Sequence, residues 1–195
     1  MRLTIGLLGG SFNPAHSGHR EVSLSALRRL KLDQVWWLVS PQNPLKPTAG
    51  MAPLDARLRQ ARIVAQDRRI WVSDIERPLG TRYTADTLRR LVQLCPGVRF
   101  VWLMGADNLA GIHRWRAWRH IFETLPIAVL ARPAYAHAAL AGRAARVFRA
   151  ARVPEAQARS LARRCPPAWT FLHTRLDPTS ATDLRRRGQG VPHQE

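Results

Sequence analysis

Two histidines three residues apart, His16 and His19, stand near the start of the chain in the stretch GGSFNPAHSGH. An imidazole can donate a hydrogen bond to a phosphate oxygen, and it can also carry a positive charge near neutral pH. The stretch opens with Gly9 and Gly10, which we expect to allow close backbone approach and a positive φ. A pair of imidazoles beside a glycine-containing turn therefore predicts a loop that binds phosphate.

The same stretch lies between a predicted strand over residues 3–8 and a predicted helix that runs from residue 18 to residue 30. We expect the backbone amides around Ser11 and Phe12 to face the phosphate, aided by the N-terminus of that helix. The loop is not a dinucleotide fingerprint, because G-x-G-x-x-G is absent. It is not a P-loop either, because no Gly-Lys-Ser/Thr follows.

Two later stretches also predict anion contacts. Lys46 ends the stretch SPQNPLK, and only two of the 31 basic residues are lysines. Proline-rich loops are commonly turns, but a compact ammonium group suits phosphate oxygens. In YTADTL we expect Thr84 to cap a helix through its hydroxyl, with Asp86 and Thr87 in the first turn. The amides at that helix start could also hold an anion.

A fourth stretch, GADNLAGIHRWRAW, follows a predicted strand over residues 98–105. Gly105 closes the strand, and Asp107 stands where a carboxylate can accept hydrogen bonds from ribose hydroxyls. Trp115 and Trp118 are three residues apart and would share one face of a helix. We expect Trp118 to be a core residue.

Apolar strands alternate with helices along the whole chain, which predicts a parallel sheet covered on both faces. Right-handed crossovers then give a doubly wound, Rossmann-like α/β fold that binds ligands outside the carboxyl ends of its strands. We expect a single domain over residues 1–195, with a C-terminal helical extension and a C-terminal subregion at 135–187. Within it, the Ala/Arg-rich residues 135–164 are predicted to be helical, with a break near Pro154. The predicted strands cover residues 3–8, 34–40, 70–75, 98–105, 126–132 and 168–174.

The composition limits the class of protein. A net charge of +18 would suit a nucleic-acid binder, but the arginines are spread along the chain, which argues against a dedicated nucleic-acid role. The apolar runs are too short to span a bilayer or to form a signal peptide. Cys95 and Cys165 form neither a disulfide framework nor a metal-binding spacing. We therefore expect a cytoplasmic protein with no membrane partner, and monomer and dimer both remain open.

The stretch GGSFNPAHSGH resembles the G-x-F-x-P-x-H-x-G-H signature of the nucleotidyltransferase superfamily that shares the HxGH element with class I aminoacyl-tRNA synthetases. Nearly the whole chain, least so over residues 135–164, is similar to bacterial nicotinate-nucleotide adenylyltransferases. The resemblance implies transfer of AMP from ATP to nicotinate mononucleotide, which gives deamido-NAD and pyrophosphate. The further matching stretches are SPQNPLK (40–46), RYTADTL (82–88), GADNLAGIHRWRAW (105–118), ARP (131–133) and SATDLR (180–185).

The resemblance also implies which residues contact the substrates, and Trp115 would stack on the pyridine ring. Ala181 replaces a family serine, so one hydroxyl contact is missing. The implied catalytic residues are His16, His19, Lys46 and Arg185. The other implied ATP-binding residues are Gly10, Ser11, Phe12, Gly105, Asp107, Arg132, Ser180 and Thr182. The implied nicotinate mononucleotide-binding residues are Asn13, Tyr83, Thr84, Ala85, Trp115 and Arg116.

We expect the ionised 5′-phosphate of the mononucleotide to attack ATP in line, without a covalent intermediate. Mg²⁺ would arrive with ATP and be held mainly by phosphates and water. A sister adenylyltransferase that uses pantetheine phosphate is disfavoured by YTADT and by the Trp-rich segment. RNA binding driven by the positive charge is the non-enzymatic alternative. A fragment of a class I aminoacyl-tRNA synthetase is disfavoured, because the sequence contains no KMSKS-like loop. The sequence leaves open whether nicotinate or nicotinamide mononucleotide is preferred. Backbone amides would decide this preference, and every residue has a backbone.

Overall fold

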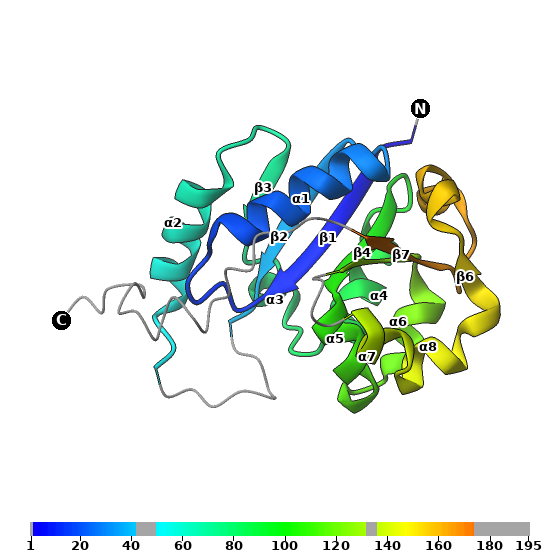
Figure 1. The fold of residues 1–195 in the computed structure, drawn as a ribbon. Helices are drawn as coiled ribbons and strands as arrows, with labels where there is room; N and C mark the ends of the chain where they lie inside the picture. Colours follow the sequence, from blue (N-terminus) through cyan, green and yellow to red (C-terminus); the bar gives the residue numbers. More distant parts are fainter. Residues whose placement is uncertain (1, 42–49, 132–135, 174–195) are drawn as a thin grey trace.

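A computed structural model describes residues 2–41, 50–131 and 136–173. Within these residues, seven strands form one parallel sheet in the order β3-β2-β1-β4-β5-β7-β6 (Figure 1). The doubly wound α/β fold expected from the sequence is confirmed. The strands are β1 (Thr4–Gly10), β2 (Gln34–Val39), β3 (Ile70–Ser73), β4 (Arg99–Gly105), β5 (Ile127–Ala131), β6 (Arg152–Val153) and β7 (Trp169–His173).

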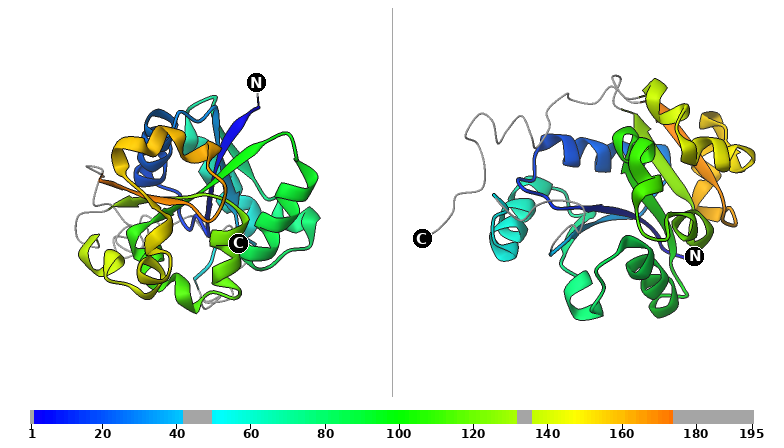
Figure 2. Two further views of the ribbon diagram at one scale, coloured as in Figure 1. Left: turned by 90° about the vertical axis from the view of Figure 1, so that its right-hand side faces the viewer. Right: turned by 90° about the horizontal axis from the view of Figure 1, so that it is seen from below.

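Helices cover both faces of the sheet, so that α1 and α2 lie on one side and α4 lies on the other (Figure 2). The helices are α1 (Ser17–Arg29), α2 (Leu54–Ala65), α3 (Glu76–Leu79), α4 (Thr84–Leu94), α5 (Ala106–Gly111), α6 (Trp118–Thr124), α7 (Ala136–Leu140) and α8 (Arg143–Val147). The 3₁₀ segments are η1 (Ile112–Arg114), η3 (Arg149–Ala151) and η4 (Glu155–Arg163). None of the helices described here is long and apolar enough to cross a membrane.

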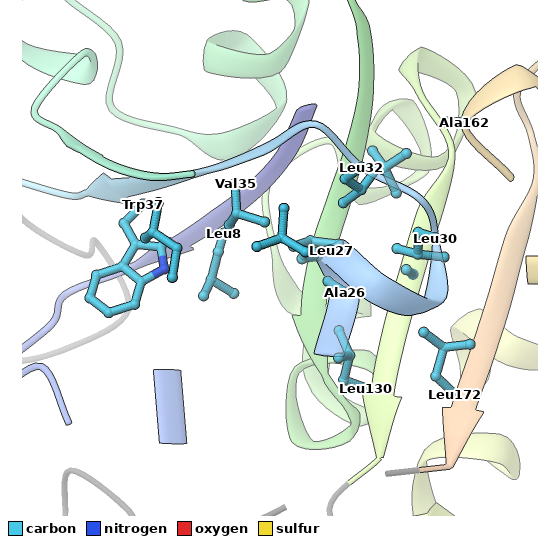
Figure 3. Close-up of a cluster of buried hydrophobic side chains, with 14 of the residues drawn as sticks. Leu8, Ala26, Leu27, Leu30, Leu32, Val35, Trp37, Leu130, Ala162 and Leu172 are labelled. Carbon is cyan, nitrogen blue, oxygen red and sulfur yellow. The ribbon is translucent and has the colours of Figure 1, made fainter. Parts of the chain in front are cut away.

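The core consists of two apolar layers, one on each face of the sheet. Figure 3 shows the layer under α1, where Leu27 of the helix and Leu30 at its C-cap gather with Leu8, Leu130 and Leu172 of the strands. The opposite layer packs α4, α5 and α6 on alternate residues of the same strands. Because both faces are covered, the strands are apolar throughout, which is why their positions could be predicted from the sequence.

The order of the strands creates a reversal between β1 and β4. From β1 the chain proceeds outward through β2 to β3, and from β4 it proceeds in the opposite direction through β5. The helices that follow β1 and β4 therefore lie on opposite faces, which leaves a crevice outside the carboxyl ends of these two strands. Gly10 and Gly105 end the two strands, so the GGSFNPAHSGH and GADNLAG stretches meet at this crevice.

The Ala/Arg-rich segment differs from the helical region expected over residues 135–164. Two short helices are separated at Gly142, where an added Cβ would lie 3.0 Å from the carbonyl oxygen of Ala139. The chain then forms β6, which pairs with β7, and the Thr170 hydroxyl donates to the Val153 carbonyl over 3.0 Å. A strand of two residues is too short to show a period in the sequence.

The predicted helix that carries both Trp115 and Trp118 is also interrupted. Trp115 has an extended backbone (φ −78°, ψ 145°), and Ala117 adopts a left-handed conformation with φ 51° before α6 begins. Neither conformation can continue a helix, so the two indoles do not share a helical face. Trp118 was expected in the core but is only partly buried; its ring packs on the edge of the core, edge-on against Phe122 at 6.2 Å and Phe148 at 5.9 Å between centroids.

Candidate active site

The two histidines of the loop hold each other at the start of α1. His16 precedes the helix as its N-cap with an extended backbone (φ −150°, ψ 170°) and is only 5% exposed. Its backbone N–H donates to Nδ1 of His19 over 3.3 Å, and the His19 backbone N–H donates to the His16 carbonyl over 3.0 Å, so the two residues are joined by hydrogen bonds in both directions. The ring centroids lie 4.0 Å apart.

This arrangement decides which nitrogen of His19 carries a proton. A backbone N–H can only donate, so Nδ1 of His19 is the acceptor and the proton of the neutral ring lies on Nε2. The Nε2–H is then the group that His19 can offer to a phosphate oxygen. The imidazole is therefore suited to donate a hydrogen bond, not to abstract a proton through Nδ1.

The left-handed residue of the loop is Phe12, not a glycine. Gly9 and Gly10 belong to β1 and lack the positive φ expected of them, whereas Phe12 has φ 46°. Gly9 is needed for space instead, because an added Cβ would lie 2.4 Å from the Trp102 ring. The Phe12 ring is 2% exposed and packs on His19 at 4.6 Å and on Trp37 at 5.1 Å, so burial of the ring stabilises the strained backbone.

Arg57 on α2 lies directly behind this loop and was not singled out from the sequence. Its side chain is buried with 1% exposure, and it donates to four backbone carbonyls. These are the carbonyls of Ser11 at 2.6 Å, Ser40 at 2.8 Å, Pro41 at 2.9 Å and Ala52 at 2.9 Å. The guanidinium thus joins the loop after β1 to the end of β2. Burial lowers the pKa of Arg57 from its ordinary value.

Asn13 is occupied by contacts within the protein. Its side-chain amide donates to the Gly50 carbonyl over 2.9 Å, and its Oδ1 accepts from the Ala52 backbone N–H over 3.3 Å. The residue is 8% exposed. Asn13 therefore ties the His16 loop to the chain before α2, and the nicotinate mononucleotide contact implied for it stays a prediction.

Asp107 lies against the end of β4. An added Cβ on Gly105 would be 2.3 Å from Oδ1 of Asp107, which shows that the carboxylate folds back over the Gly105 backbone. Asp107 itself is exposed, in the first turn of α5. Gly105 and Asp107 thus place a solvent-accessible carboxylate at the β1–β4 crevice, where ribose hydroxyls could donate hydrogen bonds to it.

The start of α4 offers backbone amides without a side-chain cap. Thr84 is the first helical residue and not the cap, because Tyr83 takes that place with an extended backbone (φ −117°, ψ 138°). In the described residues, the amides of Thr84 and Ala85 donate to no backbone carbonyl. The Arg116 guanidinium lies 4.6 Å from the centroid of the Tyr83 ring. The turn after η1 and the start of α4 are therefore adjacent, which brings together residues 33 positions apart.

Two indoles differ in their packing near this position. Trp115 and Trp118 are both half-buried against the core layer under α4 to α6, but Trp118 also packs edge-on against Phe122 and Phe148, which stack on each other. The exposed part of the Trp115 ring is a surface on which a flat ring could stack. Trp115, Arg116, Tyr83 and the α4 amides therefore form a second candidate subsite.

A buried carboxyl group, Glu76, lies beneath the start of α4. It is 8% exposed and receives hydrogen bonds from the hydroxyls of Ser40 and Thr87, the latter at 3.5 Å. Burial raises the pKa of the Glu76 carboxyl, and the two hydrogen bonds offset this in part. Ser40 therefore links Glu76, through its hydroxyl, to Arg57, through its carbonyl.

The sequence was next compared with known proteins. Residues 7–187 match the family described as cytidylyltransferase-like. The chain is 55% identical over 185 residues to a protein of Methylorubrum extorquens named a probable nicotinate-nucleotide adenylyltransferase. The match covers 95% of this chain and 100% of that protein. A protein of the same name from Ruegeria sp. is 52% identical over 95% of this chain and 98% of its own. The chain belongs to the nicotinate-nucleotide adenylyltransferase family.

A solved structure shares the fold of this nicotinate-nucleotide adenylyltransferase family member. It is the Plasmodium falciparum nicotinic acid mononucleotide adenylyltransferase complexed with NaAD, with a TM-score of 0.69 and 16% identity over 94% of this chain and 83% of that chain. A structure of the same protein complexed with APC has a TM-score of 0.67 at 15% identity. At these identities the likeness concerns the fold.

Part of the site implied for this adenylyltransferase family member lies outside the described residues, namely Lys46, Arg132, Ser180, Thr182 and Arg185. The described part of the site consists of the His16–His19 pair with Gly10, Ser11 and Phe12, the Gly105–Asp107 turn, and the α4 subsite. Across residues 2–41, 50–131 and 136–173 there is no cluster of three or more His, Cys, Asp or Glu side chains that could hold a metal ion.

Arg57 and Glu76 are the residues that sequence reasoning missed. Arg57 is one of many arginines, and the helix LDARLRQARIVA shows no feature that separates it from Arg59 or Arg62. The only available signal is its spacing, three residues after Leu54 and four before Ala61, which places it on the inward side of the predicted helix. An apolar stripe that contains an arginine indicates a buried and hydrogen-bonded charge.

Proposed function

We propose that this chain transfers the AMP moiety of ATP to nicotinate mononucleotide, producing deamido-NAD and pyrophosphate in NAD biosynthesis. The observation that carries the proposal is the hydrogen-bonded His16–His19 pair after β1, at the β1–β4 crevice of a member of the nicotinate-nucleotide adenylyltransferase family. The two cysteines are free, at Cys95 and Cys165, which supports the cytoplasmic location expected for such a reaction.

The reaction is an in-line displacement at phosphorus. An oxygen of the mononucleotide 5′-phosphate forms a bond to the α-phosphorus of ATP, and the bond from that phosphorus to the bridging oxygen of pyrophosphate breaks. A phosphate monoester is largely dianionic at neutral pH, since its second pKa is about 6, so the nucleophile needs no general base. Positioning and charge stabilisation therefore supply the catalysis.

The residues at the crevice have distinct roles in this proposal. The Nε2–H of His19 donates to an α-phosphate oxygen, and His16 holds the His19 ring in the tautomer that can do so. Asp107 accepts from ribose hydroxyls. The amides around Ser11 and Phe12 contact the phosphates, which suits an anion beside the N-terminus of α1. Lys46 and Arg185 are proposed to hold the β- and γ-phosphates, with Arg132, Ser180 and Thr182 as further ATP contacts.

The second subsite receives the nicotinate mononucleotide. The amides of Thr84 and Ala85 face the carboxylate of the pyridine, because uncapped helix N-termini favour negative charge. Trp115 stacks on the pyridine ring, and such stacking contributes about 0.5–1.5 kcal/mol beyond area burial. The Arg116 guanidinium over Tyr83 adds positive charge near the carboxylate.

Mg²⁺ is proposed to enter with ATP. The described residues contain no carboxylate cluster to bind the ion, and the charge and water-retaining chemistry of Mg²⁺ suit coordination by phosphate oxygens and water. When bound, it would neutralise part of the phosphate charge.

One assay separates the candidate functions. The protein is incubated with ATP and Mg²⁺ plus nicotinate mononucleotide, nicotinamide mononucleotide or pantetheine phosphate, and pyrophosphate release is followed. We expect release with nicotinate mononucleotide. Release with pantetheine phosphate alone would assign the sister enzyme. Release with none of the three would defeat the enzymatic proposal, and RNA binding would then be the alternative to measure.

A further inference from the structure

The guanidinium of Arg57 is a buried cation whose hydrogen-bond partners in the described residues are all neutral. They are the backbone carbonyls of Ser11, Ser40, Pro41 and Ala52, and no carboxylate is among them. A buried charge is costly unless it is hydrogen-bonded, and apolar residues of similar volume often stabilise a core as well or better. The side chain therefore does more than fill space under α2.

The contact with Ser11 determines how the next peptide unit is oriented. Nη1 of Arg57 donates to the Ser11 carbonyl at 2.6 Å, which draws that oxygen toward the protein interior. In a trans peptide the carbonyl and the following N–H point in opposite directions. The Phe12 N–H is therefore directed away from Arg57, and it donates to no backbone carbonyl of the described residues.

The remaining contacts make this orientation rigid. Phe12 has φ 46°, and its ring is held between His19 and Trp37. The same guanidinium binds the Ser40 carbonyl, while the Ser40 backbone N–H donates to the Gly10 carbonyl over 2.9 Å. The ends of β1 and β2 and the intervening peptide thus form one hydrogen-bonded unit with Arg57 at its centre.

We propose that Arg57 is a positioning residue that aims the Phe12 amide at a phosphate group of ATP. This inference rests on the proposed adenylyl transfer, since it names the residue that holds one phosphate donor in place. Arg57 does not touch the substrate; it acts through the Ser11–Phe12 peptide. The positive charge directly behind the loop also adds to the attraction of the phosphates.

The first test compares Arg57→Lys with two control variants of the same helix. Lysine keeps the charge but cannot reach four carbonyls with a planar fork. We expect kcat/KM for ATP to fall about 10- to 100-fold, the range expected when a donor is misplaced by about an ångström, while KM for nicotinate mononucleotide changes less than about twofold. Arg59→Lys, an exposed position, should match the wild type.

Leu58→Ala is the control for general destabilisation of α2, because Leu58 is buried at 4% exposure and its side chain has no polar group that could donate to the loop carbonyls. It should lower Tm without a selective change in the ATP parameters. The proposal is overturned by a folded Arg57→Lys protein with wild-type ATP kinetics, or by an equal and selective ATP defect in Leu58→Ala.

A second measurement uses the wild-type protein and holds even if Arg57→Lys does not fold. The chain has five phenylalanines, so ¹⁵N-Phe labelling gives few amide signals, and the Phe12 signal is identified by its loss in Phe12→Tyr. A non-hydrolysable ATP analogue should shift the Phe12 amide proton downfield. An unchanged Phe12 signal on saturation overturns the inference. A protein that binds the analogue but releases no pyrophosphate from ATP and nicotinate mononucleotide would instead contradict the proposed function.

Discussion

His16 and His19 act together because each ring restrains the other. The bond from the His16 backbone N–H to Nδ1 of His19 directs the Nε2–H of His19 outward, and the Phe12 ring supports the His19 ring at 4.6 Å. A lone imidazole on a loop would sample several rotamers. The hydrogen bond to Nδ1 and the ring contacts remove that freedom before substrate binds, and such preorganisation is a main source of electrostatic catalysis.

His19→Ala should therefore lower kcat by about 10²- to 10³-fold, the effect expected when one preorganised donor to the transition state is removed. Turnover would be measured by pyrophosphate release, and folding by circular dichroism. His120→Ala, an exposed histidine on α6, is the matched control and should keep wild-type turnover. Near-normal turnover of His19→Ala would remove this residue from the site.

Glu76 is a buried carboxyl group whose pKa depends on its burial. Its pKa is raised, first by desolvation, so the folded protein binds this proton more readily than the unfolded chain does. The contribution of Glu76 to stability therefore decreases as the pH rises from 4.5, the ordinary pKa of the group, through its raised value in the folded state.

Glu76→Gln removes this titration, because an amide stays neutral at every pH. We expect the free energy of unfolding of Glu76→Gln, relative to the wild type, to increase as the pH rises above 4.5. Urea unfolding at a series of pH values measures the difference. Parallel pH profiles for the two proteins would show that the carboxyl titrates at the same pH in both states.

At the scale of elements, α1 is fastened to β2 by a buried hydroxyl. The indole N–H of Trp37 donates to Oγ of Ser23 over 2.7 Å, and the Ser23 hydroxyl donates to the His19 carbonyl over 2.8 Å. Trp37 and Ser23 are both fully buried. The ring of Trp37 supports Phe12, so this contact connects the packing of the helix to the geometry of the phosphate loop.

Ser23→Ala leaves the Trp37 N–H without its acceptor in the core. An unsatisfied buried donor costs about 1–3 kcal/mol, so the free energy of unfolding should fall by about that amount in urea titrations. Ser160→Ala removes a surface hydroxyl whose hydrogen-bond partners in the described residues, the Gln157 carbonyl and the Arg164 guanidinium, are both within four residues, and it should change stability by less than about 0.5 kcal/mol. Equal stability of Ser23→Ala and the wild type would contradict the assigned role.

At the scale of the whole molecule, the net charge of +18 surrounds a site for anionic substrates. Several arginines pair with nearby carboxylates, as in Arg69–Asp67, Arg77–Asp74 and Arg89–Asp86, but the excess of positive charge remains. Such a field raises the rate of encounter with phosphorylated substrates and weakens as salt screens it.

We expect kcat/KM for ATP to fall several-fold when the ionic strength rises from about 0.02 M to about 0.3 M, where the Debye length shortens below about 10 Å. The measurement uses initial rates at constant free Mg²⁺, with Tm recorded at each salt concentration to exclude unfolding. An uncharged osmolyte at matched viscosity is the control. A kcat/KM that is independent of salt would show that the global charge does not serve substrate capture.

The elements that the sequence determined are those marked by local patterns. Apolar runs placed the six longer strands, because a parallel strand is buried on both faces and must be apolar throughout. The loop that carries His16 was also legible, since prolines, glycines and histidines at close spacing constrain the chain locally. The start of α4 was predicted correctly at Thr84, although Tyr83 and not Thr84 is the cap. The break between Trp115 and Trp118 was not legible, because no residue type there forbids a helix.

The sequence by itself therefore determined the sheet, the family and the position of the His16 loop. Only the tertiary structure decided that Phe12, and not Gly9 or Gly10, takes the left-handed conformation in this loop. It also decided that Arg57, out of many arginines, is the one buried behind the loop. Both outcomes depend on partners distant in sequence, such as Trp37 for the ring of Phe12 and the carbonyls of Ser11 and Ser40 for Arg57. A buried charge is tolerated only where the fold brings acceptors to it, and the residue type alone carries no record of those acceptors.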